Sequence, residues 1–234
     1  MLGGHIAGLR RRKYAVLLAL LLVVLAVETF LAQSGAERLG SDVLRTLLVV
    51  AIWIVIFERP RERATMAAVL LVSMAIGWGR YLTVASLDRA LALTNELALT
   101  LFLWSAVYVI LRDLFRAKAA GAENVLGAVC GYLIAGNAWA QMNAFAYLLV
   151  PSAYSVNPEL AGLLPDWHGR IALFTYYAFA QVMTIGYSGV TPVHAPATTL
   201  SLFAALFGVF YTAVVVSQFV GLAQQPKRET PTDQ

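Results

Sequence analysis

Residues 184–192 read TIGYSGVTP and separate a short apolar stretch, residues 171–183, from a long one, residues 196–222. At 1.5 Å per residue, a helix over the short stretch extends about 20 Å, too short to cross a hydrocarbon core of about 30 Å. We therefore expect this stretch to enter a membrane and to return to the side from which it came. Non-helical backbone at that depth is tolerated only where it is buried in protein or lines a water-filled path. The order of these segments predicts a pore.

The composition of the whole chain favours a membrane protein. Of its 234 residues, 60% are hydrophobic and 13% are charged, and the mean hydropathy is +0.72. About a quarter of the residues of a soluble domain are charged, so this composition excludes an ordinary soluble protein and a disordered chain. The net charge of +4 does not indicate nucleic-acid binding, because the basic residues flank apolar runs, as membrane topology requires.

Six apolar stretches are long enough to be membrane spans. With the N-terminus inside, most of the 17 Lys and Arg residues fall on the inner side, which predicts cytoplasmic N- and C-termini. The first stretch with its basic start also resembles a signal peptide, whose cleavage would leave the remaining topology unchanged. We expect an all-α integral membrane protein with six transmembrane helices, at about residues 14–32, 42–57, 64–84, 90–111, 124–150 and 196–222.

A polar stretch at residues 113–123 divides the chain. Residues 1–112 are predicted to form a four-span bundle, and residues 113–123 an inner linker. Residues 124–222 are predicted to form a pore domain of outer helix, ordered turret, pore helix, filter loop and inner helix. Residues 223–234 are a short cytoplasmic tail, and we expect no ligand-binding domain in either tail.

The TIGY string at residues 184–187, followed by Pro192, resembles the filter signature of the potassium-channel superfamily, Thr-Val/Ile-Gly-Tyr/Phe-Gly-Asp. The resemblance covers about residues 125–222. It implies a homotetrameric pore with one pore loop per chain, because one chain offers one loop and a closed ring needs four. The implied partners are three identical subunits, membrane lipid and permeant monovalent cations, and the implied location is a plasma membrane. No organic cofactor is implied, only K+ ions in the filter.

The resemblance implies that K+ is coordinated by stacked backbone carbonyls, which replace its hydration shell. Successive carbonyls point in one direction only if the backbone alternates in handedness, and Gly186 adopts a positive φ at little cost. The ion-coordinating residues would be Thr184, with its hydroxyl, Ile185, Gly186, Tyr187 and Ser188.

Two positions depart from the family pattern. Ser188 stands where the family has its second glycine, and Gly189 stands where it has an acidic residue. A left-handed conformation costs a non-glycine residue roughly 1–2 kcal/mol, so we expect Gly189 to take the turn instead. Loss of the acid removes negative charge from the pore mouth. Both changes weaken the expectation of strict potassium selectivity, and a weakly selective cation channel is a variant of the same function.

Residues next to the filter are expected to support it. The pore helix would direct its negative C-terminal end at the central cavity. Tyr176 and Tyr177 would pack around the filter and brace Tyr187, and Met183 is expected to be a packing residue.

Gly208 lies where the family's inner helix carries a glycine hinge. A glycine inside a helix costs about 1 kcal/mol relative to alanine, so its presence needs a reason. Close packing against the pore helix and a gating bend are both open. Thr212 and Val216 follow on the same helix face and would line the lower cavity.

The six-span plan also resembles that of voltage-gated channels. A voltage sensor needs several charges within the membrane, each worth about 2.3 kcal/mol per 100 mV. Residues 90–111 contain no Arg or Lys, and Glu96 is their one acidic residue. We therefore expect a sensor-like bundle without strong voltage sensing.

Ionisable residues occur in or near the spans and at the pore mouth. For Glu28, Arg45, Arg80 and Glu96, the simplest expectation is that their side chains reach the outer interface. Pairing of Glu96 with Arg80 and a proton relay are alternatives. His194 is either a solvated residue or one that makes conduction pH-dependent.

Two other functions remain open. A secondary transporter would use Glu96 and Glu28 as coupling carboxylates, although the inverted repeats that would favour it are not found in the sequence. A non-conducting, pore-derived partner subunit is the other. The sequence contains no nucleophile–base pattern, metal-ligand cluster or phosphate loop, so we do not expect an enzyme. A short chain rich in Ala and Leu, with a basic start, fits a bacterial inner membrane.

Overall fold

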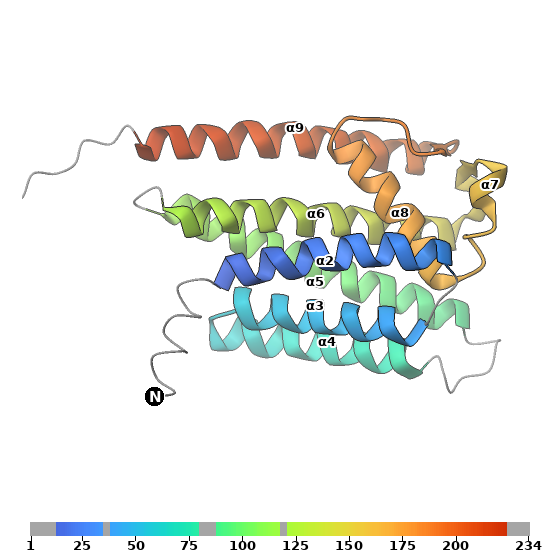
Figure 1. Cartoon of the computed structure of the whole chain (residues 1–234), viewed down its shortest axis with the longest axis horizontal. Helices are drawn as coiled ribbons and strands as arrows, with labels where there is room; N and C mark the ends of the chain where they lie inside the picture. Colours follow the sequence, from blue (N-terminus) through green and yellow to red (C-terminus); the bar gives the residue numbers. More distant parts are fainter. Residues whose placement is uncertain (1–12, 35–37, 80–87, 118–120, 224–234) are drawn as a thin grey trace, which may run out of the picture.

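Long helices run side by side in this computed structural model, and one shorter helix crosses obliquely among them (Figure 1). The structure describes residues 13–34, 38–79, 88–117 and 121–223. The long helices are α2 (Lys13–Ser34), α3 (Arg38–Ile56), α4 (Pro60–Gly79), α5 (Asp88–Arg116), α6 (Ala122–Leu149) and α9 (Ala195–Ala223). Between α6 and α9 lie the 3-10 turn η1 (Pro151–Ala153), strand β1 (Tyr154–Val156), α7 (Pro158–Ala161), α8 (Trp167–Val182) and strand β2 (Val190–Pro192).

Within the described residues, three segments are long and apolar enough to cross a membrane: Arg89–Arg116, Ala122–Leu149 and Ala195–Gly221. The chain is thus an α-helical protein with membrane-spanning character, as its composition predicts. Helices α2, α3 and α4 have 22, 19 and 20 residues and extend to about 29–33 Å. Six spans remain a prediction.

Two helix boundaries differ from the predicted ones. Helix α4 begins at Pro60 rather than near residue 64, because the fixed φ of proline suits the first helical position. The predicted span continued to residue 84, but residues 80–87 lie outside the described part. The inner linker is shorter than residues 113–123, since α5 continues to Arg116 and α6 begins at Ala122.

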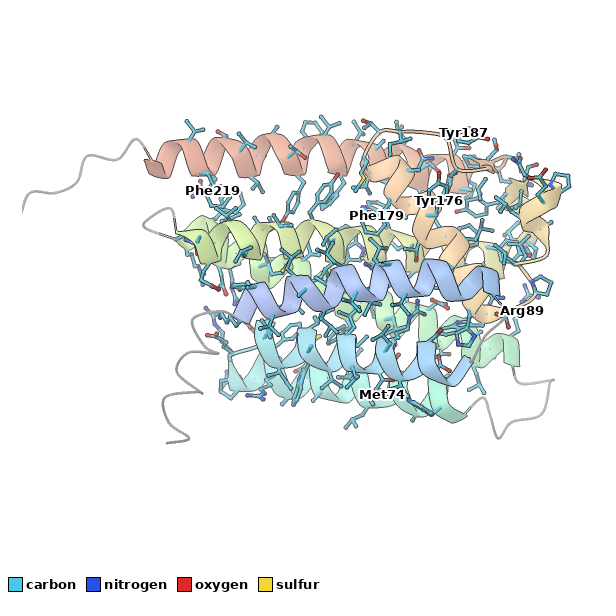
Figure 2. All side chains as sticks on the ribbon, viewed as in Figure 1. Met74, Arg89, Tyr176, Phe179, Tyr187 and Phe219 are labelled. Carbon is cyan, nitrogen blue, oxygen red and sulfur yellow. The ribbon has the colours of Figure 1, made fainter. Side chains whose placement is uncertain are left out.

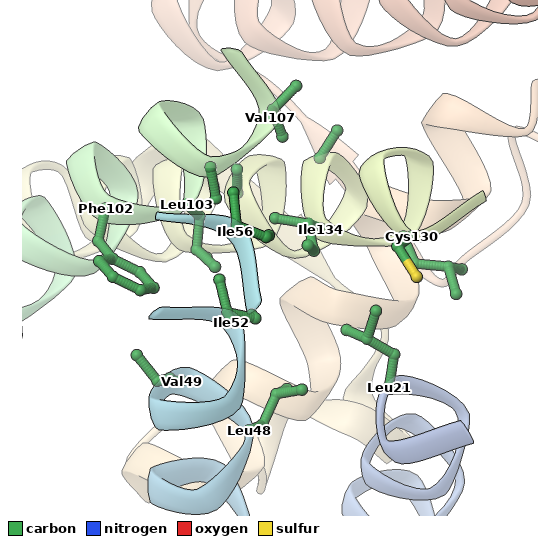
Figure 3. Close-up of a cluster of buried hydrophobic side chains, with 14 of the residues drawn as sticks. Leu21, Leu48, Val49, Ile52, Ile56, Phe102, Leu103, Val107, Cys130 and Ile134 are labelled. Atoms are coloured by element: carbon green, nitrogen blue, oxygen red, sulfur yellow. The ribbon is translucent and has the colours of Figure 1, made fainter. Parts of the chain in front are cut away.

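One hydrophobic core joins the four-helix bundle to the rest of the chain. Figure 3 shows side chains of α2, α3, α5 and α6 meeting in this core, among them Leu21, Ile52, Leu103 and Ile134. Cys130 is fully buried there, in agreement with its apolar sequence context. The segments predicted as a bundle and a pore domain therefore share one packed interior.

The chain between α6 and α9 returns to the end of the molecule from which it started. Strand β1 pairs antiparallel with β2, with Tyr154 opposite Pro192 and Val156 opposite Val190. Helix α8 lies between these strands in sequence, and its 16 residues extend about 24 Å. The short helix therefore enters the protein and the following loop leads back (Figure 1). The predicted turret at residues 151–170 contains η1, β1 and α7, and the strand pairing was not predicted.

A buried side-chain hydrogen bond holds β1 to α6. The Tyr154 hydroxyl donates to Asn143 Oδ1 at 2.7 Å, and Asn143 Nδ2 donates to the Trp139 carbonyl at 2.7 Å. Asn143 is fully buried. Burial raises the pKa of the Tyr154 hydroxyl above its ordinary value, so the residue stays a hydrogen-bond donor. The strand pair is thereby fixed to the long helix.

Helices α8 and α9 approach closely at Gly208. A Cβ atom at this position would lie 1.8 Å from the Val182 carbonyl oxygen, so only glycine fits there. Nearby, the hydroxyls of Tyr177 on α8 and Ser201 on α9 form a hydrogen bond. Of the two reasons expected for Gly208, the structure shows close packing, and a gating bend stays a prediction.

Replacing Gly208 by alanine should destabilise the protein. Overpacking of an interior costs typically 1–3 kcal/mol, and here the added atom meets rigid backbone. We expect a lower thermal unfolding midpoint in detergent. Gly221→Ala is the matched control on α9, because nothing lies within 4 Å of its added Cβ and alanine favours a helix by roughly 0.5–1 kcal/mol. Equal midpoints for the two variants would contradict the packing described here.

Tyr154→Phe should also lower stability, by about 1–3 kcal/mol, because it leaves the buried Asn143 oxygen without its donor. The midpoint of chemical unfolding measures this loss. Tyr108→Phe serves as the control, since Tyr108 lies exposed on α5 and its variant should match the parent. A Tyr154 variant as stable as the Tyr108 variant would show that the hydrogen bond contributes nothing.

Candidate functional site

The filter-like segment follows a helix that is capped and buried. Asp166 precedes α8, and its Oδ2 accepts a hydrogen bond from the Gly169 N–H at 3.0 Å, as a helix N-cap does. Tyr177 and Phe174 are fully buried on α8. The helix ends at Val182 against α9, which places residues 184–189 beside that contact. We call these residues the filter loop.

Backbone hydrogen bonds at the end of α8 set the start of the filter loop. The N–H of Thr184 donates to the Gln181 carbonyl at 2.9 Å, and the N–H of Ile185 donates to the Ala180 carbonyl at 2.8 Å. Thr184 has a φ of 57°. This is the pattern of a Schellman helix end, in which the residue after the cap is left-handed. The roughly 1–2 kcal/mol that this conformation costs a threonine is offset by these hydrogen bonds.

Hydrogen bonds to the Ala180 carbonyl make the carbonyls of Thr184 and Ile185 point in the same direction. The N–H of Gly186 also donates to the Ala180 carbonyl, at 3.1 Å. In a trans peptide, the N–H and the preceding C=O point in opposite directions. Because the N–H groups of Ile185 and Gly186 both point back at α8, the carbonyls of Thr184 and Ile185 both point away from it. Gly186 has a φ of 76°, so positive φ values occur at 184 and 186 but not at 185.

The carbonyl oxygens of the filter loop are available to a ligand. Within the described residues, the carbonyls of Thr184, Ile185, Gly186 and Tyr187 accept no hydrogen bond. All four residues are exposed in the single chain, Ile185 at 64% and Tyr187 at 76%. The negative end of the α8 dipole lies beside them. Such a run of oxygens has the chemistry to coordinate a cation that has lost its water.

The far end of the loop is attached to the turret. Gly189 has a φ of 70°, whereas Ser188 is not left-handed, so Gly189 takes the turn, as expected from the departure at these two positions. The Asn157 N–H donates to the Gly189 carbonyl at 2.9 Å. Ser188 is buried, and its hydroxyl donates to the Val190 carbonyl at 3.4 Å. The outermost predicted ligand, Ser188, is therefore held by the strand.

The two tyrosines of α8 do not act as expected within one chain. Tyr177 is fully buried and turns toward α9, where it bonds to Ser201. Tyr176 is 53% exposed, and Figure 2 labels it and Tyr187. None of the described ring contacts joins Tyr176 or Tyr177 to Tyr187. Tyr177 supports the loop indirectly, by fixing α8. Met183, expected to pack, is exposed in the single chain, and its carbonyl accepts a hydrogen bond from the Thr184 hydroxyl at 2.7 Å.

The predicted cavity residues lie on an exposed part of α9. Thr212 donates its hydroxyl proton to the Gly208 carbonyl at 3.0 Å, and both Thr212 and Val216 are exposed in the single chain. The exposed apolar side chains of α9 also include Val209 and Phe210. His194, expected at the pore mouth, is exposed just before α9.

The expectation that Glu96 reaches the membrane interface is wrong. Its side chain is 0% exposed, and its Oε1 accepts a hydrogen bond from Trp167 Nε1 at 2.9 Å. A buried carboxyl group needs a hydrogen-bond partner. The packing of α8 against α5 makes Trp167 that partner. The side chain of Glu28 and all of Arg80 lie outside the described residues, so the pairing of Glu96 with Arg80 stays a prediction.

No family model matches the chain, and no curated protein or solved structure matches it. Its function is therefore inferred from the residues and their geometry.

Proposed function

We propose that this protein is a homotetrameric channel that passes monovalent cations, K+ among them, down their gradient. The observation that carries this proposal is the run of four carbonyls, from Thr184 to Tyr187, that accept no hydrogen bond within the described chain. In the proposed assembly, neighbouring copies would cover these residues, and backbone oxygens that are cut off from bulk water require another partner. A desolvated cation is the partner that an uncharged oxygen ring attracts.

Several copies are needed to complete the site. One chain supplies only one side of each oxygen ring, and a ring around a central axis needs the same loop from symmetry-related copies. The exposed apolar side chains of Ile185 and Tyr187 support this assembly, since large exposed apolar patches mark contact surfaces. Neighbouring copies would cover these residues, and Thr212 and Val216 would face the cavity below.

The distribution of charge supports the proposed orientation. Basic residues gather where α2 and α4 begin and α5 ends, namely Lys13, Arg61, Arg63, Arg112 and Arg116. Of these, Lys13 pairs with Glu58, and Arg112 pairs with Glu62 at 2.6 Å. These residues belong to the end of the molecule opposite the turret (Figure 1). A basic end is the one that remains in the cytoplasm, so the turret would lie outside, with six spans and both termini inside. The departures at Ser188 and Gly189 make weak selectivity for potassium over sodium part of the proposal.

The buried Glu96 favours a second candidate, a secondary transporter. An ionisable residue inside a membrane protein is a functional candidate by default, and Glu96 is bonded to Trp167 on the helix that leads to the filter loop. In this alternative, a carboxylate would bind a proton or cation and couple its movement to that of a substrate. A non-conducting partner subunit is the third outcome that the following measurement distinguishes.

Cation flux in liposomes tests these alternatives. Purified protein under a K+ gradient should produce a flux that is electrogenic and independent of a proton gradient, and native mass spectrometry should give four chains per complex. Na+ in place of K+ measures the selectivity. Exchange that requires protons would support the transporter instead, and a folded protein without flux would support the partner subunit.

Gly186→Ala should reduce the flux by at least about tenfold, because alanine at a positive φ costs roughly 1–2 kcal/mol in each copy and favours another carbonyl direction. Nothing in the single chain lies within 4 Å of the added Cβ, so the variant should still fold. Gly162→Ala is the control, since its φ is −62° and its added Cβ also meets nothing. Parent-like flux in the Gly186 variant would contradict the role given to this backbone.

The conductance should depend only weakly on voltage. Residues 90–111, which form most of α5, carry no Arg or Lys, and each charge crossing the membrane field would contribute about 2.3 kcal/mol per 100 mV. Recordings in planar bilayers should give a gating charge of less than one elementary charge per subunit. Gating currents of several elementary charges per channel would refute this expectation.

A further inference from the structure

The N-terminal turn of α8 is held by charged side chains of the four-helix bundle. Trp167 donates its indole N–H to Glu96 of α5, and the Arg45 guanidinium of α3 stacks 4.7 Å from the Trp167 ring centroid. His168 Nε2 lies 3.0 Å from Asp42 Oδ1 of α3. We call these five residues the bundle–pore junction. Two bundle helices thus contact the first turn of the helix that carries the filter loop.

The junction is buried and polar, unlike the apolar core. Glu96 is 0% and Asp42 is 8% exposed. A cavity of about 50 Å³ is lined in part by Asp42, Arg45, Asn95 and Trp167. A water molecule needs roughly 10–15 Å³ of such volume, so the cavity has room for a few. Apolar packing would hold α8 at less cost in desolvation, so these polar contacts suggest a role beyond stability.

Helix α8 connects the junction to the filter loop. Its last turn carries the Ala180 carbonyl that accepts the N–H groups of Ile185 and Gly186. A helix of 16 residues is stiff, and α9 contacts it at the Tyr177–Ser201 hydrogen bond and at Gly208, among other places. A displacement at Trp167 therefore changes the position of the groups that direct the filter carbonyls.

We propose that Trp167 is a positioning residue for the filter loop, and that the bundle–pore junction passes the conformation of the bundle to the filter. The inference rests on the proposed channel function. It assigns a role to a bundle whose α5 carries no Arg or Lys over residues 90–111: the bundle sets the filter conformation through the start of α8, by way of Glu96 and Asp42.

Trp167→Phe tests the proposal, because it keeps an aromatic ring beneath Arg45 and removes the indole donor together with some ring volume, a loss that the control below shares. The chain offers a matched control at Trp53 on α3. Trp53 Nε1 donates to the Arg63 carbonyl at 2.9 Å, and the Arg63 guanidinium lies 4.7 Å from its ring centroid. Trp53→Phe thus removes the same kind of donor beside a stacked arginine, but in a contact between α3 and α4.

Single-channel recording in bilayers gives the decisive measurements. A hydrogen bond to a charged group contributes enough to shift a conformational equilibrium by about tenfold or more. We expect Trp167→Phe to change the open probability or the K+/Na+ permeability ratio by about tenfold, and Trp53→Phe to leave both at the parent values. Thermal unfolding of both variants is measured in parallel, since a merely structural contact would lower stability without moving either quantity.

The outcomes separate this proposal from the channel function. If the parent conducts and Trp167→Phe behaves like Trp53→Phe, the positioning role is wrong and the channel stands. If the parent carries no cation flux, both proposals fall.

Glu96→Gln changes the acceptor of the same hydrogen bond, on α5. This variant tests the proposal if the Trp167 variant does not fold. It keeps an oxygen acceptor of the same size and exchanges the carboxyl group for an amide, so we expect a shift of the same sign and smaller size. Where both variants fold, their effects should be non-additive, as for residues that share one contact. Additive effects, or a Glu96→Gln channel identical to the parent, would overturn the coupling.

Discussion

The geometry of the filter loop depends on one carbonyl oxygen, that of Ala180, which accepts the N–H groups of both Ile185 and Gly186. These two hydrogen bonds turn the carbonyls of Thr184 and Ile185 away from α8 and leave them open to a ligand. Peptide planarity transmits the constraint from donor to acceptor within each unit. Backbone groups of the last turn of α8 therefore orient these carbonyls, and no side chain takes part.

The rest of the structure keeps this helix end in place. Gly208 lets α9 contact the Val182 carbonyl, and the Tyr177–Ser201 hydrogen bond fixes the same pair of helices. The pairing of β1 with β2 holds the far end of the loop, and the Tyr154–Asn143 hydrogen bond ties that pairing to α6. The loop is thus attached at both ends to elements that share the core of the protein, while its middle remains exposed.

The sequence predicted those structural features that depend only on neighbouring residues, such as helix length and the backbone conformation of single residues. The length of residues 171–183 predicted a helix that cannot cross a bilayer, and α8 is short, with a following loop that leads back to the starting end. The preference of glycine for positive φ predicted the turn at Gly189. The direction of Tyr177 and the burial of Glu96 were not predicted, because apolar periodicity does not tell which neighbour a helix face will meet. The strand pair was missed since three-residue strands carry no periodic signal.

By itself, the sequence determined a helical membrane-type chain, a short helix followed by TIGY, and the absence of Arg and Lys from residues 90–111. Each of these follows from composition, length or the conformational preference of single residues. Only the tertiary structure decided that Glu96 bonds to Trp167, that Tyr177 faces α9, and that Gly208 is a point of contact. These facts join residues up to 71 positions apart, and such pairings are set by how the helices pack rather than by any local preference.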